Sequence, residues 1–240
     1  MPLPRAILFD LDDTLIRAYA QPEEAWRRLL ATFAEPLAAH DAPAIERVRV
    51  ALMDEARAMW TDPAAAARWR LDIPGARRLA TRRGLERLGF DDEALADRIA
   101  DAFTEMRRRE YRLYPDAHDT VDALRAAGVK LALVTNGAAE TQRAKIERFD
   151  LAHRFEHIQI EGEFGQGKPE LAVYRHALER LGCDAGDAWM VGDNYEWEVV
   201  APQKLGMCGI WYDPFETGIP AGATHTPTRI IRRLGELLED

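Results

Sequence analysis

The sequence predicts an α/β fold: a Rossmann-like three-layer core with a parallel sheet, plus an inserted all-helical cap domain. From residue 113 onward, short apolar runs alternate with helical patterns, which is typical of parallel strands covered by helices on both faces. Between residues 17 and 112 the apolar spacing is helical throughout. We therefore expect residues 1–16 and 113–240 to form the core and residues 17–112 to form the cap.

The first strand is expected at residues 6–9, where the apolar run Ala-Ile-Leu-Phe leads into the polar sequence Asp-Leu-Asp-Asp-Thr. The block that follows is rich in alanine, arginine, leucine and glutamate, which favours helices. Prolines divide this block into about four or five helices, with breaks at Pro36, Pro43, Pro63 and Pro74.

Strands and helices alternate in the second part of the chain. We predict further strands over residues 129–134, 156–160, 188–191 and 208–212. Helical spacing is found in the segments 116–127, 139–149, 169–181 and about 196–205. Glycine follows three of these helices, where a left-handed residue commonly ends a helix, at Gly128, Gly182 and Gly206. This order of elements predicts a parallel sheet.

The composition excludes several classes of protein. With 240 residues, 47% apolar and 30% charged, the chain is too apolar to be disordered and long enough for a core and a smaller domain. No apolar run approaches the roughly 18 residues of a membrane-spanning helix, and the start lacks a secretory pattern. Cys183 and Cys208 form no C-x-x-C pair, so neither a disulfide framework nor a zinc ribbon is expected. We expect a cytoplasmic protein without a membrane partner.

The charge distribution argues against a nucleic-acid partner. The net charge is −9, from 41 acidic and 32 basic residues. The densest basic run, Arg107 to Arg109, lies in a helical segment with acidic neighbours, and we expect it on a solvated helix face. Only four of the basic residues are lysines, so a lysine within a motif stands out.

Polar residues follow the predicted strands, where ligands bind in open α/β sheets. They are Asp10, Asp12, Thr135, Asn136, Lys168, Asp193 and Asn194. Two acids separated by one residue can face the same small volume, and Asp193 can reach it from a neighbouring strand. Such oxygen ligands suit Mg²⁺, which takes one or two carboxylates plus water and substrate phosphate. The lysine and the small polar side chains can hold phosphoryl oxygens, so these residues predict phosphoryl transfer.

A carboxylate can also be the nucleophile in phosphoryl transfer. We expect Asp10 to attack phosphorus and form an aspartyl-phosphate. Asp12 is expected to protonate the leaving alcohol and then to deprotonate the water that cleaves the intermediate. In this scheme Thr135, Asn136 and Lys168 bind the phosphate.

These motifs resemble those of the haloacid dehalogenase (HAD) superfamily, in subfamily I, which has a helical C1 cap after the first strand. The first motif matches residues 9–16, the second residues 135–137, the third Lys168 in Gly-Lys-Pro-Glu and the fourth residues 191–194. The resemblance implies that Mg²⁺ is held by Asp10, the backbone carbonyl of Asp12, and Asp193. The segment 135–147 is similar to the N-acylneuraminate-9-phosphatase and nucleotidase branch of the superfamily.

The fourth motif departs from the family pattern at one position. The second acid of this motif is usually aspartate, whereas this chain has Glu198. The longer side chain can hydrogen-bond a metal-bound water or Lys168, or it can leave Asn194 or Glu196 in that role. We therefore keep both Glu198 and Asn194 as candidates for supporting the metal site.

The predicted function is a Mg²⁺-dependent phosphomonoesterase that hydrolyses a small phosphorylated metabolite. By the resemblance, a phosphomutase would carry glycine at the position of Asp13, and a haloacid dehalogenase would lack the acid at position 12. A non-catalytic module that binds a metabolite or a partner is the alternative outside the enzymes. Sugar phosphates, nucleoside monophosphates and phosphoglycolate stay open as substrates, and both a monomer and a homodimer as assemblies.

Overall fold

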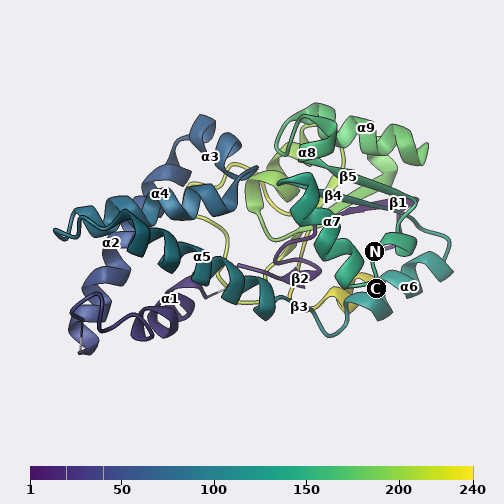
Figure 1. Cartoon of the computed structure of the whole chain (residues 1–240). Coiled ribbons are helices and arrows are strands. Elements are labelled where there is room, and N and C mark those ends of the chain that lie inside the picture. The colour runs from purple at the N-terminus through teal and green to yellow at the C-terminus, as the bar shows by residue number, and fades with distance from the viewer. Residues whose placement is uncertain (20, 40, 240) are drawn as a thin grey trace. The chain divides into compact units, whose positions relative to one another are not determined.

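The computed structural model describes residues 1–19, 21–39 and 41–239. It divides into two compact units (Figure 1): an α/β unit of Met1–Arg17 and Arg112–Asp240, and a helical unit of Ala18–Tyr111. That the helical unit caps a site in the α/β unit stays a prediction. Within the described ranges, no helix combines the length and the apolar character needed to cross a membrane.

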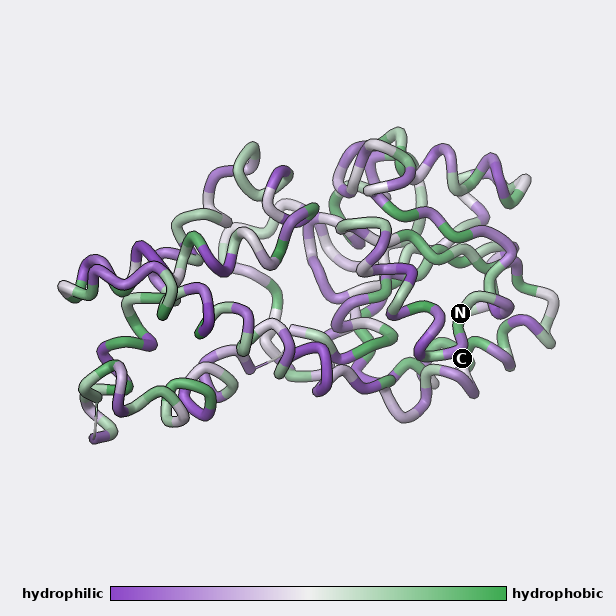
Figure 2. Tube along the Cα trace, viewed as in Figure 1, coloured by the Kyte–Doolittle hydropathy of each residue, from purple (hydrophilic) through white to green (hydrophobic). Residues whose placement is uncertain are grey.

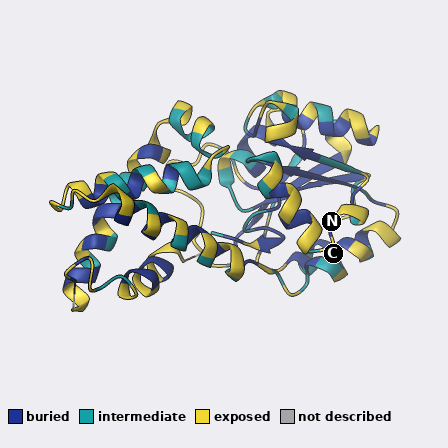
Figure 3. Cartoon of the chain, viewed as in Figure 1, coloured by how far each residue is buried: buried dark blue, intermediate teal, exposed yellow. Residues whose placement is uncertain are grey.

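The described residues of the α/β unit form a six-stranded parallel sheet in the order β5-β4-β1-β6-β7-β8. In that order the strands are His157–Ile160, Lys130–Thr135, Ala6–Phe9, Ala188–Gly192, Cys208–Tyr212 and Arg229–Ile231. β1 and β6 are buried along their whole length, as expected for parallel strands covered on both faces. The apolar character and the burial of the sheet can be followed in Figures 2 and 3. The predicted α/β class is confirmed.

Helices on opposite sides of the sheet complete the three layers (Figure 1). The α-helices of this unit are α6 (Ala117–Ala126), α7 (Ala139–Arg148), α8 (Glu161–Phe164), α9 (Leu171–Leu181) and α10 (Ala201–Gln203), with 3₁₀ turns at Ala152–Arg154, Ala185–Asp187 and Leu234–Leu238. On one face, Tyr174 and Ala177 of α9 pack against Leu8 of β1 and Val134 of β4. This apolar packing anchors α9 to the centre of the sheet.

The register of the sheet brings the ends of the central strands to one level. Phe9, the last residue of β1, lies beside Leu133 of β4 and Val191 of β6. The Asp10 backbone N–H donates to the Val191 carbonyl at 2.9 Å, which continues this alignment by one residue. The residues after β1, β4 and β6 therefore leave the same edge of the sheet, where α/β folds bind ligands.

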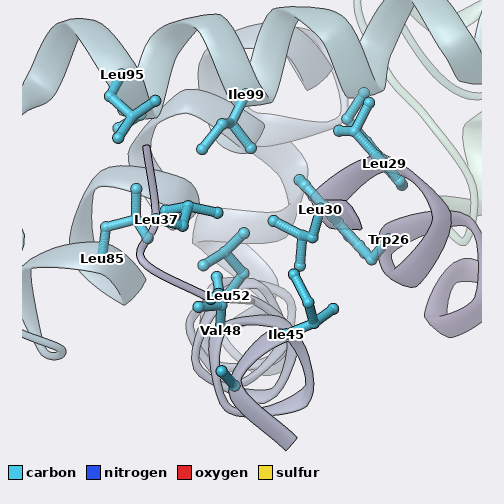
Figure 4. Packing of buried hydrophobic residues seen from close by; sticks show 14 of the residues in the cluster. Trp26, Leu29, Leu30, Leu37, Ile45, Val48, Leu52, Leu85, Leu95 and Ile99 are labelled. Carbon is cyan, nitrogen blue, oxygen red and sulfur yellow. The ribbon is translucent and has the colours of Figure 1, made fainter. Parts of the chain in front are cut away.

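The helical unit contains the helices α1 (Pro22–Ala31), α2 (Ala42–Thr61), α3 (Pro63–Trp69), α4 (Ile73–Glu86) and α5 (Glu93–Glu110). Four of them begin at an aspartate whose carboxylate accepts a backbone N–H of the first turn, at Asp41, Asp62, Asp72 and Asp92. The apolar faces of α1, α2, α4 and α5 meet in one cluster, where Leu30, Leu52 and Ile99 converge (Figure 4). This unit therefore has a core of its own.

Some elements differ from those expected. β8 and an antiparallel pair, β2 (Ile16–Arg17) with β3 (Arg112–Leu113), were not predicted. Strands of two or three residues are too short to show periodicity in a sequence. The helix expected at about 196–205 begins with a π-helical turn, Glu196–Val200, before α10. Such turns occur often at functional sites.

The arginine run on α5 lies only partly on a solvated face. Arg108 and Arg109 are exposed, as expected. Arg107 is buried, and its guanidinium donates to the Glu110 carboxylate at 3.2 Å and to the Ala18 carbonyl at 2.8 Å. The expectation is wrong for Arg107, because a run of like charges does not show which position of a helix turns inward.

Candidate active site

Lys168 joins two of the predicted acidic residues inside the α/β unit. Its ammonium Nζ donates to Asp10 Oδ1 at 2.5 Å and to Glu198 Oε1 at 2.8 Å. Lys168 and Glu198 are fully buried, and Asp10 is 7% exposed. Burial alone would lower the pKa of Lys168, but the charges of Asp10 and Glu198 outweigh it and raise that pKa. Lys168 is therefore a fixed positive charge beside the predicted nucleophile.

Local structure holds Asp10 and Lys168 in place. The Asp10 Oδ2 atom accepts a hydrogen bond from the Thr14 hydroxyl at 3.2 Å. The side-chain amide of Asn136 accepts from the Lys168 N–H at 2.7 Å and donates to the Lys168 carbonyl at 2.8 Å. Burial raises the pKa of Asp10, although Lys168 opposes the shift. The Asn136 side chain thus contacts the lysine backbone, and a role of this residue in phosphate binding stays a prediction.

Glu198 occupies the position where the family pattern has aspartate, and it contacts Lys168. Its second carboxylate oxygen accepts the backbone N–H of Asn194 at 2.8 Å. Asn194 in turn uses its side-chain oxygen to accept the backbone N–H of Trp197 at 3.2 Å. Glu196 is exposed and lies 3.7 Å from Lys204. Of the two acids, Glu198 and not Glu196 lies against Lys168.

The close approach of Glu198 depends on the glycine at the end of β6. A Cβ atom on Gly192 would lie 2.3 Å from the Glu198 Cγ and 2.9 Å from the Asp10 Cβ. Gly192→Ala is therefore expected to lower the free energy of unfolding by about 1–3 kcal/mol, as overpacking does in cores. Urea unfolding measures this. Gly186→Ala is the control, because its Cβ meets nothing within 4 Å; equal stability of the two variants would contradict the packing.

The stability of the metal-free protein should depend on the ionisation of Glu198. Burial raises the pKa of Glu198 from 4.5 to about 7 in the folded chain, with Lys168 opposing. The protonated carboxyl therefore stabilises the folded chain fully below pH 4.5, and this contribution is lost as the pH rises through about 7. We expect Glu198→Gln to flatten this part of the pH dependence, measured by urea unfolding in EDTA. The exposed Glu196→Gln should keep the wild-type slope, and a wild-type slope in Glu198→Gln would refute the expectation.

Asp193 follows β6 and lies near enough to Asp10 and Glu198 for their charges to act on it. Burial, reinforced by the charges of Asp10, Glu198 and Asp13, raises the pKa of Asp193 well above its ordinary value. Lys168 thus contacts the carboxylates of Asp10 and Glu198, and its charge also acts on that of Asp193. A divalent cation bound here would favour the ionised form of these carboxyls, which burial disfavours.

The donor set fits Mg²⁺ better than a metal held by side chains alone. Among residues 1–19, 21–39 and 41–239, no three His, Cys, Asp or Glu side chains form a cluster that could hold a metal. Mg²⁺ binds through one or two carboxylates and keeps its remaining positions for water and phosphate. Asp10 and Asp193 can supply those carboxylates.

Asp12 lies in a different environment from Asp10. Both of its carboxylate oxygens accept hydrogen bonds from the Lys145 ammonium at 2.7 Å. Gln142 donates to Asp12 Oδ2 at 3.0 Å and to the Thr135 hydroxyl oxygen at 2.6 Å. Lys145 and Gln142 are 3% and 2% exposed. The Gln142 side chain therefore links Asp12 to Thr135, the first residue of the second motif.

Sequence reasoning assigned no role to Gln142 and Lys145. They are three residues apart on α7 and so lie on one face of the helix. A signal was present, because Lys145 is one of only four lysines and follows the second motif closely. Without structure, polar residues at helical spacing indicate a solvent-facing surface.

Lys145→Met is expected to lower kcat by about 10- to 100-fold, because displacing a reacting group costs rates of this order. KM for the same substrate should change little if Lys145 only orients Asp12. Steady-state kinetics separates the two constants. The control is Lys204→Met, because the Lys204 side chain is exposed and Lys204 is distant from Lys145 in the sequence. An unchanged kcat in Lys145→Met would show that Asp12 needs no such support.

The loop after β4 contacts a buried carboxylate that the sequence analysis did not single out, that of Glu161. Glu161 of α8 is buried and accepts the backbone N–H of Gly137 at 3.0 Å. A Cβ on Gly167 would lie 2.5 Å from the Glu161 carboxylate, so glycine is required beside it. Glu161 thereby links the second motif to the loop that carries Lys168.

The chain is similar to a known protein family and to several named proteins. A family model for haloacid dehalogenase-like hydrolases matches residues 4–206. Phosphoserine phosphatase of Thermus thermophilus is 40% identical over 132 residues, which cover 55% of this chain and 52% of that protein. The chain thus spans about half the length of this relative. Phosphoglycolate phosphatase 1 of Pseudomonas aeruginosa is 29% identical over 237 residues, which cover 98% of this chain and 79% of that protein.

Two further likenesses bear on the predicted branch and fold. N-acylneuraminate-9-phosphatase of Rattus norvegicus is 29% identical over 150 residues, covering 62% of this chain and 60% of that protein, which confirms the predicted resemblance. The crystal structure of a 2-haloacid dehalogenase from Pseudomonas syringae superposes with a TM-score of 0.62 and 28% identity, covering 99% of this chain and 97% of that one. With its parallel sheet and four strand-end motifs, the chain belongs to the haloacid dehalogenase-like hydrolases.

Proposed function

We propose that this protein is a Mg²⁺-dependent phosphomonoesterase that hydrolyses a small phosphorylated metabolite through an aspartyl-phosphate on Asp10. The observation that supports this proposal most strongly is that two aspartates of one loop form ion pairs with different lysines, Asp10 with Lys168 and Asp12 with Lys145. Two carboxylates in different environments are suited to different chemical roles. The named phosphatases among the relatives support this proposal.

In the first step the Asp10 carboxylate attacks phosphorus, and the leaving alcohol takes a proton from Asp12. Lys168 keeps the nucleophile oriented through its 2.5 Å hydrogen bond, and its charge offsets the negative charge of the phosphoryl oxygens. In the second step the Asp12 carboxylate takes a proton from water, which attacks the phosphorus of the aspartyl-phosphate. The bond between phosphorus and the Asp10 oxygen breaks, so inorganic phosphate leaves and the Asp10 carboxylate is regenerated. Lys145 and Gln142 hold the Asp12 carboxylate in place through hydrogen bonds of 2.7 and 3.0 Å.

Asp10, Asp193 and the backbone carbonyl of Asp12 are the groups that we propose to hold Mg²⁺. When bound, the cation supplies charge neutralisation for the phosphoryl oxygens. Glu198 contacts Lys168 and the Asn194 backbone, so it orients these groups rather than the substrate. Asp193→Asn is expected to weaken Mg²⁺ binding, which calorimetry with the metal alone can measure.

The test is phosphate release from a panel of phosphorylated metabolites and an aryl phosphate, with Mg²⁺ and with excess EDTA. The proposal expects release that depends on Mg²⁺ and that EDTA abolishes. Halide release from 2-haloacids would instead favour a dehalogenase, and phosphate transfer between hydroxyls without release would favour a phosphomutase. No turnover in a folded protein that binds a metabolite would favour the non-catalytic binding module.

A further inference from the structure

One residue of the second motif is held at both of its backbone groups by a single helix. The Glu161 carboxylate of α8 accepts the Gly137 N–H at 3.0 Å, and the Gly162 N–H of the same helix donates to the Gly137 carbonyl at 3.0 Å. Gly137 has a φ of 119°, in the region that favours glycine. Because glycine can adopt many backbone conformations, these contacts from outside the loop select one of them.

The segments around α8 approach the second motif closely. A Cβ atom on Gly162 would lie 2.6 Å from the backbone nitrogen of Ala139. A Cβ on Gly167 would lie 2.5 Å from Glu161 Oε1 and 2.8 Å from the Asn136 side-chain oxygen. Glu161 itself is 7% exposed. Its carboxylate is therefore closely packed between the second motif and the loop that leads to the third.

The peptide group that Glu161 binds lies between Asn136 and Gly137. The carbonyl of this peptide, that of Asn136, accepts the Thr135 hydroxyl at 3.4 Å. The Asn136 side-chain amide donates to the Lys168 carbonyl at 2.8 Å and accepts the Lys168 N–H at 2.7 Å. The orientation of this one peptide therefore affects where the Asn136 side chain, and with it Lys168, can lie.

The same segment also leads into the helix that supports Asp12. α7 begins at Ala139, two residues after Gly137. It carries Lys145, whose ammonium contacts both carboxylate oxygens of Asp12 at 2.7 Å. A change of the backbone at Gly137 is therefore passed to the start of α7. Both lysine–aspartate pairs of the candidate active site can thus be reached from one backbone position.

A charged acceptor binds a backbone N–H more strongly than a neutral one, so a carboxylate is suited to holding a peptide in one orientation. We propose that Glu161 is a positioning residue, which fixes the peptide between Asn136 and Gly137 and so places Lys168 and Lys145 against their aspartates. The effect on turnover rests on the proposed function, whereas the placement of the two lysines does not.

The first arm of the test observes the lysines by NMR and does not depend on activity. The chain contains four lysines, so ¹³C labelling at lysine Cε gives only four signals to assign. In Glu161→Ala the signals of Lys168 and Lys145 should shift, and those of the other two lysines should not. Glu163→Ala is the matched control, because exposed Glu163 also joins α8 to α7, through Arg143 at 2.7 and 2.6 Å. It should leave all four signals in place.

Two further variants separate the contact from the charge. Glu161→Asp keeps the charge but is one carbon shorter, so it should lose the bond to Gly137 and shift the same lysine signals as Glu161→Ala. Glu161→Gln loses the charge but keeps the length and an acceptor oxygen, so its shifts should be smaller. If the signal of Lys168 or of Lys145 keeps its wild-type position in folded Glu161→Ala and Glu161→Asp, the proposal is overturned.

The second arm measures kcat and KM with an aryl phosphate and Mg²⁺. Glu161→Ala and Glu161→Asp should lower kcat by about 10- to 100-fold, because misplacing reacting groups costs rates of this order. KM should change less than kcat, and the kcat of Glu161→Gln should lie between those of wild type and Glu161→Ala. Glu163→Ala should keep the wild-type kcat.

A purely structural role of Glu161 gives a different result, which urea unfolding makes visible. The variants would then unfold at lower urea concentrations, while the folded protein kept the wild-type kcat and lysine signals, and this would overturn the proposal. If Glu161→Ala does not fold, the comparison of Glu161→Asp with Glu161→Gln decides, with the larger loss expected for Glu161→Asp. Shifted lysine signals in a chain whose wild type releases no phosphate would support the positioning and refute the phosphatase.

Discussion

Asp10→Asn is expected to lower kcat by about 10⁴- to 10⁶-fold, the range seen when a covalent nucleophile is removed. The amide keeps the size and shape of the side chain but offers no anionic oxygen to attack phosphorus. Lys168 would also lose the carboxylate that accepts its 2.5 Å hydrogen bond. Single-turnover phosphate release with an aryl phosphate and Mg²⁺ measures the effect.

Asp13→Asn is the matched control for that variant. Asp13 lies in the same loop and has a left-handed backbone with φ of 58°, a conformation that asparagine tolerates well. Its kcat should stay within about tenfold of wild type, because it has no role in the proposed steps. Residual activity of Asp10→Asn within tenfold of the Asp13→Asn value would rule out Asp10 as the nucleophile.

Asp12→Asn is expected to lower kcat by about 10²- to 10⁴-fold, the usual contribution of a general acid or base. The loss should depend on the leaving group. An aryl oxide leaves without needing a proton, so the first step survives for an aryl phosphate, whereas an alkyl phosphate is affected in both steps. An aryl phosphate should therefore give a burst of phenol equal to the enzyme, followed by slow turnover.

The pairing of Asp12 with Lys145 and Gln142 makes this variant informative. Lys145→Met keeps the carboxylate, so it should show a smaller loss of kcat and no dependence on the leaving group. Stopped-flow measurements with both esters separate the burst from the steady state. Turnover of Asp12→Asn near wild type with an alkyl phosphate would assign the proton transfers to another group.

The strand-end motifs could be predicted from sequence because apolar runs and their polar ends are local features. The run at β1 and its exit into Asp10 needed only four apolar residues and the chemistry of the acids that follow. The alignment of Phe9 with Leu133 and Val191 is non-local, since it joins strands that are more than a hundred residues apart. Sequence could therefore name the candidate residues, while their mutual distances needed the structure.

The partners of the site residues were the least predictable part. Lys145 has a position on α7 that suggests a solvated lysine, yet it is buried against Asp12 because a charged partner is available there. The sequence left open whether the Glu198 side chain contacts a water, Lys168 or neither. In the structure Glu198 lies in a π-helical turn and contacts Lys168. Each of these contacts depends on packing between elements, which no local pattern encodes.

The measurement that tests the central claim most directly is the identification of a phosphorylated residue during turnover. Wild type and Asp12→Asn are mixed with an aryl phosphate and Mg²⁺, quenched in acid and digested for mass spectrometry. If Asp10 is the nucleophile, one phosphoryl group is found on the peptide containing Asp10, and more of it accumulates in Asp12→Asn. Steady phosphate release with no phosphoryl group on Asp10 in either protein would contradict the aspartyl-phosphate mechanism.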